Sequence, residues 1–189
     1  YVTGAGKAFC AGQDIGELVG EGKMELAQVL SEHYNPIVKR IRALQKPVVC
    51  AVNGVAAGAG ANIALACDIT IAKSSASFIQ AFSKIGLIPD SGGTFILPRL
   101  IGQQKAMALM MTGEKVSAPD AVQMNMIYKS IDDDAFDAEL TAFAIKLANM
   151  PTKALALTKA ALHASWNNTL EEQLALELDY QVTAGNTSD

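Results

Sequence analysis

Cysteine and histidine are scarce in this chain. Its 189 residues include three cysteines and two histidines, and no two cysteines form a CxxC pair. Zinc sites are built from closely spaced cysteine and histidine ligands, so we expect no metal. A sparse, odd set of cysteines is typical of a reducing compartment, which predicts a cytoplasmic protein. Cys50 and Cys67 stand in apolar runs and are expected to be buried.

Runs of positive charge and long apolar stretches are also missing. The net charge is −4 and no Lys/Arg-rich run occurs, so nothing favours a nucleic acid partner. No apolar run reaches the length of a transmembrane helix, so no membrane partner is expected. Half of the residues are hydrophobic and 18% are charged, a balance typical of a globular domain with a sizeable core.

Short apolar runs alternate with helical patterns along most of the chain. Strands are expected at 1–3, 48–52, 68–72, 76–82 and 127–131. Helices are expected at 25–44, with a break at Pro36, at the small-residue segment after the glycine-rich turn at 53–60, and at 103–111, 134–149, 152–165 and 169–184. This order predicts an α/β fold with parallel strands, divided into a core at 1–130 and a helical region at 131–189.

Two helix starts and two loops have local signatures. Ser117 and Thr169 are expected N-caps, the second in a capping box with Glu172. Segment 6–14 is expected to be a loop, and the glycine spacing at 4–7 does not match a phosphate-binding loop. Gly58-Ala59-Gly60 opens a helix after a strand, but Ile63 stands where a dinucleotide site needs its third glycine.

The small residues at 54–61 allow two interpretations. Unpaired N–H groups at a helix start, covered only by glycine and alanine, could bind an oxyanion. The same small side chains also allow close packing of a buried helix on a sheet.

Asp90 in GLIPDSGGT (86–94) is similarly ambiguous. The side chain of Asp90, between Pro89 and Ser91, could serve only to form the local hydrogen bonds of a turn. Alternatively, its carboxylate takes part in a reaction. Ser91 is not in a nucleophile elbow, because Pro89 stands where glycine is needed. No histidine is an obvious partner for it, since His33 and His163 lie in helical segments expected to be exposed.

Three separated segments, 8–15, 46–69 and 82–102, together resemble the enoyl-CoA hydratase/isomerase (crotonase) superfamily, and 114–131 follows its pattern. Within it, HYNPIVKRI, NGVAAGAGA and AFSKIGLIPDSGGT resemble the 1,2-epoxyphenylacetyl-CoA isomerase (ring-epoxide isomerase) branch. The resemblance implies a crotonase-like spiral of ββα units followed by a helical trimerisation region. It also implies that the first strands and the final C-terminal segment lie outside this sequence, which opens like the end of a strand.

The resemblance also implies the site. The oxyanion hole would use the backbone N–H groups of Gln13 and Ala59. The substrate would be a coenzyme A thioester, with no separate cofactor. The residues expected to bind it are Phe9, Ala11, Gln13, Asp14, Ile15, Gly58, Ala59, Phe82 and Pro89.

Two departures from the family pattern point to the reaction. The two glutamates of typical hydratases fall at Asn62 and Phe82, which leaves Asp90 as the expected catalytic acid and base. One carboxylate is enough for a proton shuttle, so we expect a CoA-thioester isomerase acting on the ring epoxide of phenylacetyl-CoA or on a 3-enoyl-CoA. The alternatives are an enoyl-CoA hydratase and a non-catalytic acyl-CoA-binding protein.

The C-terminal helices leave the assembly open. By resemblance we expect a homotrimer or a dimer of trimers. The alternative is that these amphipathic helices fold back on their own chain.

Overall fold

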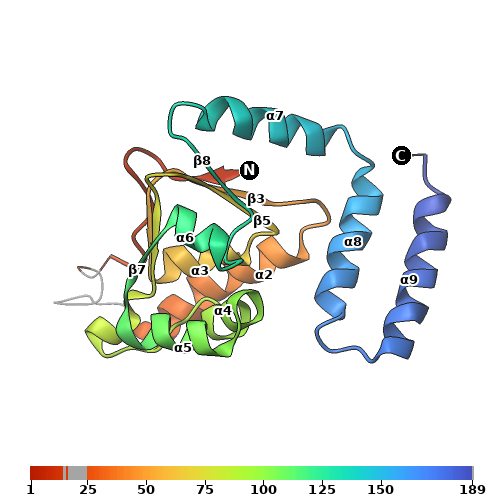
Figure 1. Cartoon of the computed structure of the whole chain (residues 1–189). Coiled ribbons are helices and arrows are strands. Elements are labelled where there is room, and N and C mark those ends of the chain that lie inside the picture. Colours follow the sequence, from red (N-terminus) through yellow and green to blue (C-terminus); the bar gives the residue numbers. More distant parts are fainter. Residues whose placement is uncertain (15, 17–24, 189) are drawn as a thin grey trace.

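The computed structural model describes residues 1–14, 16 and 25–188. Its strands form two four-stranded sheets, here called sheet A and sheet B (Figure 1). Sheet A contains β1 (Val2–Thr3), β3 (Val49–Val52), β5 (Ile69–Lys73) and β8 (Lys129–Ile131). Sheet B contains β2 (Ala8–Cys10), β4 (Val55–Ala57), β6 (Ser77–Ile79) and β7 (Lys115–Ser117).

The chain alternates between the two sheets. Sheet A has the order β1-β3-β5-β8 and is parallel throughout. Sheet B has the order β2-β4-β6-β7, with only β7 antiparallel to its neighbour. Each early strand of sheet A is followed by one of sheet B, so successive strand pairs wind as a spiral with helices between them.

Helices occupy the connections and the C-terminal region. The N-terminal half contains α1 (Leu26–Gln28), the π-helix η2 (Val29–Tyr34), α2 (Asn35–Ala43), α3 (Ala59–Ala66), the 3₁₀-helix η3 (Ala81–Ile85) and α4 (Gly93–Ile101). The rest contains α5 (Gln103–Thr112), α6 (Ala118–Gln123), α7 (Phe136–Ala148), α8 (Thr152–Ala164) and α9 (Leu170–Gly185). The Ser117 cap and the Thr169–Glu172 capping box are both confirmed.

Strand β3 separates two apolar clusters, because alternate side chains of a strand point to opposite faces. Cys50 and Val52 pack in a main core that fills the space between the sheets and around α3; its largest members include Leu65, Phe78 and Leu97. The other side chains of β3 pack in a smaller outer core beneath α7, formed by Val49, Ala51, Ile71, Ile131, Phe136 and Leu140. The predicted burial of Cys50 and Cys67 is confirmed.

Three short strands were missed or misplaced by the sequence. The expected loop at 6–14 contains β2, and the expected glycine-rich turn at 53–60 contains β4, so both loop assignments were wrong there. No strand was expected at β7. Each has three residues, too few for a periodic pattern, and each gains its hydrogen bonds from a partner distant in sequence.

The helix expected at 25–44 is not split at Pro36. Residues 26–43 are helical throughout: a π-helical segment lies directly before α2, and Pro36 stands in the first turn of α2. Proline has no N–H to donate to the preceding turn, and the change from π-helical to α-helical hydrogen bonding falls beside it.

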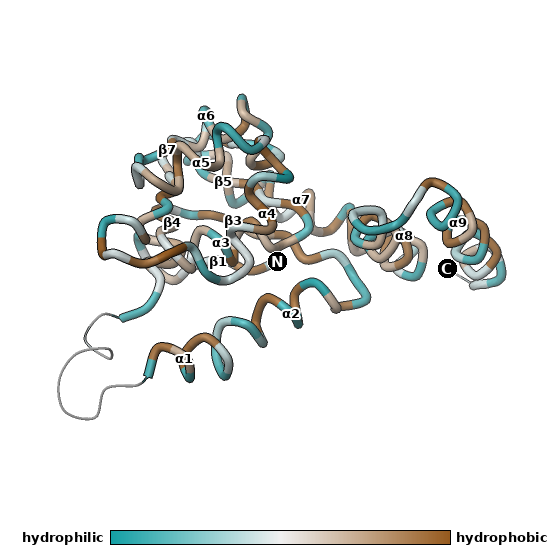
Figure 2. The backbone as a smooth tube through the Cα atoms, turned by 90° about the horizontal axis from the view of Figure 1, so that it is seen from below, coloured by the Kyte–Doolittle hydropathy of each residue, from teal (hydrophilic) through white to brown (hydrophobic). Residues whose placement is uncertain are grey.

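Helices α8 and α9 lie side by side at one end of the molecule, with α8 between α9 and the body that holds the sheets (Figures 1 and 2). The chain reaches them through α7, which runs across the outer face of sheet A. Among the helices that the structure describes, none combines the length and apolar character required to cross a membrane.

Candidate active site

The N-terminus of α3 forms one side of the candidate site. Gly58 precedes the helix with φ 54°, a conformation that favours glycine, and its own N–H donates to Ile79 O at 2.9 Å. Ala59 is the first helical residue and is 4% exposed. The N–H groups of a first helical turn have no partner inside the helix, so they can bind an acceptor from outside.

The loop after β2 packs closely against this helix start. A Cβ atom on Gly12 would lie 3.2 Å from Ala57 O and 3.5 Å from Ala59 N. One on Gly60 would overlap the backbone of Cys10. Gln13 therefore follows a glycine that touches the backbone around Ala59, which brings the two expected oxyanion donors into neighbouring segments.

An aromatic side chain lies beside Gly58. Phe82, in η3, is 5% exposed, and its ring Cζ lies 3.8 Å from where a Cβ of Gly58 would stand. Phe78 is also buried, in the main core. An apolar neighbour of this kind keeps water from the helix start.

Asp90 stands in a tight turn just before α4. Ser91 and Gly92 have φ values of 51° and 78°, and Gly93 N donates to Asp90 O at 2.8 Å, a pattern typical of a type I′ turn. The hydroxyl of Ser91 donates to Asp90 Oδ1 at 2.9 Å. The turn thus gives the carboxyl a donor from its own neighbour.

Burial raises the pKa of Asp90 above its ordinary value. Desolvation of the half-buried carboxyl is the larger effect, and the hydrogen bond from Ser91 opposes it. A carboxyl that takes up a proton more readily than usual suits a group that must both accept and return one.

Asn62 connects Asp90 to α3. Its side chain is fully buried; Nδ2 donates to Asp90 O at 2.9 Å, and Oδ1 accepts from Gln80 Nε2 at 2.8 Å. Asp90 is therefore joined to the helix that begins at Ala59. The sequence indicated only that Asn62 replaces a carboxylate, and it gave no sign of Gln80, because the pairing spans distant segments.

The remaining expected substrate residues are spread around these segments. Phe9 is half-buried against the main core, while Ala11 and Asp14 are exposed, with Asp14 Oδ1 accepting from Gly16 N. Pro89 lines an apolar cavity of about 520 Å³ between η3, α4 and α5. Ile15 lies outside the described residues.

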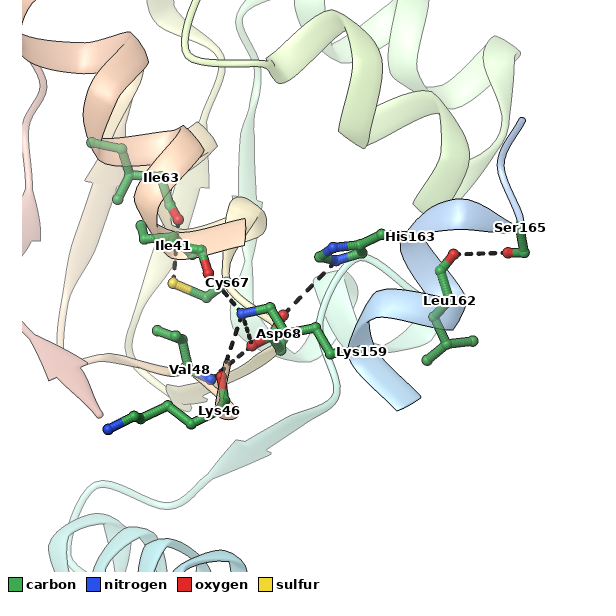
Figure 3. A network of polar contacts seen from close by, with 10 residues as sticks. All are labelled: Ile41, Lys46, Val48, Ile63, Cys67, Asp68, Lys159, Leu162, His163 and Ser165. Atoms are coloured by element: carbon green, nitrogen blue, oxygen red, sulfur yellow. Dashed lines mark hydrogen bonds and ion pairs between the residues drawn. The ribbon is translucent and has the colours of Figure 1, made fainter. Parts of the chain in front are cut away.

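A buried ionic cluster lies away from this site, between α8 and the body (Figure 3). Lys159 Nζ lies 2.8 Å from Asp68 Oδ2 and donates to Ile41 O at 2.7 Å. His163 lies 3.9 Å from Asp68, and its ring lies tilted beside that of Trp166. It was expected to be exposed and is instead half-buried, and burial lowers its pKa; His33 is exposed as expected.

Comparisons with known proteins show which family the chain is similar to. Residues 2–189 match the family model described as enoyl-CoA hydratase/isomerase. The chain is 47% identical to the 1,2-epoxyphenylacetyl-CoA isomerase of Escherichia coli (strain K12), and 46% identical to a probable enoyl-CoA hydratase of Rhodobacter capsulatus. In both cases the match covers 100% of this chain and 73% of the relative.

Solved structures are similarly close. An enoyl-CoA hydratase from Polaromonas sp. JS666 superposes with a TM-score of 0.92 at 35% identity, over 98% of this chain and 73% of the other. An enoyl-CoA hydratase from Bacillus anthracis gives a TM-score of 0.91 at 34% identity, over 99% of this chain and 72% of the other.

Proposed function

Since the chain belongs to the enoyl-CoA hydratase/isomerase family and has the crotonase-like α/β fold expected from its sequence, we propose that it is a CoA-thioester isomerase with Asp90 as its acid and base. The observation that carries the proposal is the half-buried carboxyl of Asp90, a residue whose backbone carbonyl accepts a hydrogen bond from Asn62 in the first turn of α3. The expected glutamate positions hold Asn62 and Phe82, neither of which can exchange a proton as a carboxylate does.

The backbone N–H groups of Gln13 and Ala59 bind the thioester oxygen. When a proton leaves the adjacent carbon, negative charge develops on this oxygen as the enolate forms. Each well-placed donor stabilises that charge by about 3 kcal/mol. The close approach of the Gly12 loop to Ala59 supports this role.

Asp90 then moves the proton. Its carboxylate takes a proton from one carbon of the thioester and returns it to another, so the double bond shifts and no other reactant is consumed. The buried Phe82 ring beside Gly58 limits access of water, which favours reprotonation over hydration.

Two substrates fit this chemistry. One is ring-epoxidised phenylacetyl-CoA, rearranged to its oxepin form, and the likeness to the E. coli isomerase favours it. The other is a 3-enoyl-CoA, shifted to the conjugated 2-enoyl isomer. Both are acyl-CoA thioesters, the substrate class of the family.

Hydration is the second candidate function, because the Rhodobacter capsulatus relative is named a probable enoyl-CoA hydratase. Rapid hydration of crotonyl-CoA without a double-bond shift would favour it. Tight acyl-CoA binding with no turnover would instead favour the non-catalytic alternative.

The test is Asp90→Asn in the intact protein, assayed on the ring epoxide, 3-enoyl-CoA and crotonyl-CoA. We expect kcat for isomerisation to fall by at least about 100-fold, as for the loss of a general acid–base group. Asp133→Asn is the matched control, because Asp133 is an exposed carboxylate that also accepts from a serine. Wild-type turnover by Asp90→Asn would disprove the role of Asp90.

We also propose assembly through the C-terminal helices as a homotrimer or a dimer of trimers. One face of α9 exposes four apolar side chains at intervals of four residues, here called the α9 stripe: Leu170, Leu174, Leu178 and Val182. Lys159 in α8 and Trp166 in the turn after it both contact the body of the same chain, so folding back accounts for part of this region but leaves the stripe uncovered.

A further inference from the structure

We propose that Asn62 is a positioning residue that holds Asp90 at a fixed place relative to the oxyanion-binding end of α3. The inference rests on the proposed function and adds to it. It gives a role to Asn62, which is otherwise only the replacement of a glutamate.

Two N–H donors meet at the backbone oxygen of Asp90. Gly93 N closes the local turn at 2.8 Å, and Asn62 Nδ2 approaches from α3 at 2.9 Å. The first bond lies within the turn, so it cannot fix the position of the turn relative to the rest of the protein. The second ties the turn to the helix whose first residue is Ala59, so it sets where Asp90 lies relative to the thioester oxygen.

The orientation of the Asn62 amide is determined by its partners. A carbonyl oxygen can only accept, so Asn62 must present its NH₂ group to Asp90 O and its oxygen to Gln80 Nε2. Asn62 is fully buried and Gln80 is 5% exposed, so water does not compete for either bond. In such a setting a lost partner is costly, which makes the arrangement specific.

The space for this amide depends on Gly93. A Cβ atom added there would overlap the Asn62 amide group. Gly93 therefore allows the first turn of α4 to lie directly against Asn62.

The turn also needs an external support. Ser91 is held at φ 51°, in a left-handed conformation that a residue with a Cβ atom adopts only at a cost in free energy. The buried bond from Asn62 offsets part of that strain. An ionised carboxylate at position 62 could not do so, because it has no proton to donate to Asp90 O.

The experiment compares Asn62→Leu with Thr70→Val in the intact protein. Leucine matches the shape of asparagine and removes both hydrogen bonds. Thr70→Val is the control, because it removes another buried bond from a side chain to a backbone carbonyl, that of Thr70 Oγ1 to Ala64 O. Both variants are expected to lose stability, but only one to lose function.

For Asn62→Leu we expect kcat for isomerisation to fall about 10- to 100-fold with little change in KM, since a small misplacement of a catalytic group has that effect. Thr70→Val should keep its kcat. Hydrogen exchange at the Gly93 amide, followed by NMR, should be faster in Asn62→Leu and unchanged in Thr70→Val. A kcat for Asn62→Leu equal to that of Thr70→Val would overturn the inference.

Two further arms keep the inference testable. If Asn62→Leu does not fold, the test uses Gln80→Met, which keeps Asn62 but removes the hydrogen bond that orients its amide. An unchanged kcat in Gln80→Met would then count against the proposal. If the wild-type protein turns over neither thioester, the proposed isomerase function fails. The exchange rate at Gly93 then still tests whether Asn62 holds the turn.

Discussion

The hydroxyl of Ser91 lowers the pKa of Asp90, whereas burial raises it. Its hydroxyl hydrogen-bonds the carboxyl and so favours the ionised form, while desolvation favours the protonated one. As a base, Asp90 must be ionised, so isomerase activity is expected to fall as pH drops through its raised pKa.

Ser91→Ala should therefore raise the pKa of Asp90 further, because the ionised form loses a donor. The acidic limb of the kcat–pH profile is expected to move to higher pH. Ser74→Ala is a suitable control, since it removes a hydroxyl donor from Asp132, a carboxylate outside the site. A limb that moves to lower pH in Ser91→Ala, or equally in both variants, would contradict this account.

Gly60 shows how little space separates α3 from the loop after β2. Gly60→Ala would place a Cβ atom on the backbone of Cys10, so we expect the free energy of unfolding to fall by about 1–3 kcal/mol. Gly185→Ala, at the end of α9, meets nothing within 4 Å and is expected to change stability by less than about 1 kcal/mol. Chemical denaturation measures the free energy of unfolding of both variants. Equal values would show that the loop after β2 moves to make room for the added Cβ atom.

The site was predictable from sequence only in part. The location of Asp90 in a glycine-rich turn and of Ala59 at a helix start could be read from local residue types, and the structure agrees. The bridge from Gln80 through Asn62 could not, because side-chain pairing across distant segments leaves no periodic signal. The roles of Gln13, Ala59 and Asp90 in catalysis remain predictions.

Among the elements, length decided what the sequence could predict. The helices α7, α8 and α9 were expected nearly to their ends, because each holds several turns and α9 begins with a capping box. Strands β2, β4 and β7 of sheet B were harder, since three-residue segments are stabilised by their partners and not by their own pattern.

Helix α8 is attached by few but specific contacts. Lys159 is buried against Asp68 and two backbone carbonyls (Figure 3). Nearby, the ring of Trp166 packs at a tilt against that of Phe95, and the guanidinium of Arg42 lies 4.6 Å from the Trp166 ring centroid. The attachment therefore includes a buried ion pair in α8 and an aromatic ring in the turn after it.

Lys159→Met should release this attachment. Removing one partner of a buried ion pair leaves the other unpaired and costs about 3–5 kcal/mol. We expect faster proteolytic cleavage in the connection at 149–151 between α7 and α8. Lys129→Met is the control, because its pair with Glu139 is about half exposed and should contribute at most about 1 kcal/mol. Equal cleavage rates in the two variants would show that Lys159 does not secure α8.

At the scale of the whole molecule, the α9 stripe is the exposed apolar surface through which we expect subunits to assemble. Leu174→Glu/Leu178→Glu places two charges in the middle of the stripe. If the stripe lies in a subunit interface, sedimentation should shift toward the monomer. Ala175→Glu, exposed on α9 outside the stripe, should leave the assembly unchanged. An unchanged sedimentation coefficient for the double variant would argue that another surface mediates assembly.

The alternation of the chain between two sheets also constrains the order in which the protein folds. Parallel neighbours cannot be joined by a tight turn, so every pairing in sheet A must close a long loop: residue 49 meets 69, residue 2 meets 50, and residue 71 meets 129. Loop closure is least costly for the shortest segment, so β3 and β5 with α3 between them should nucleate the structure. The turn that holds Asp90 packs on that same helix, and it would be among the first parts of the chain to find its native place.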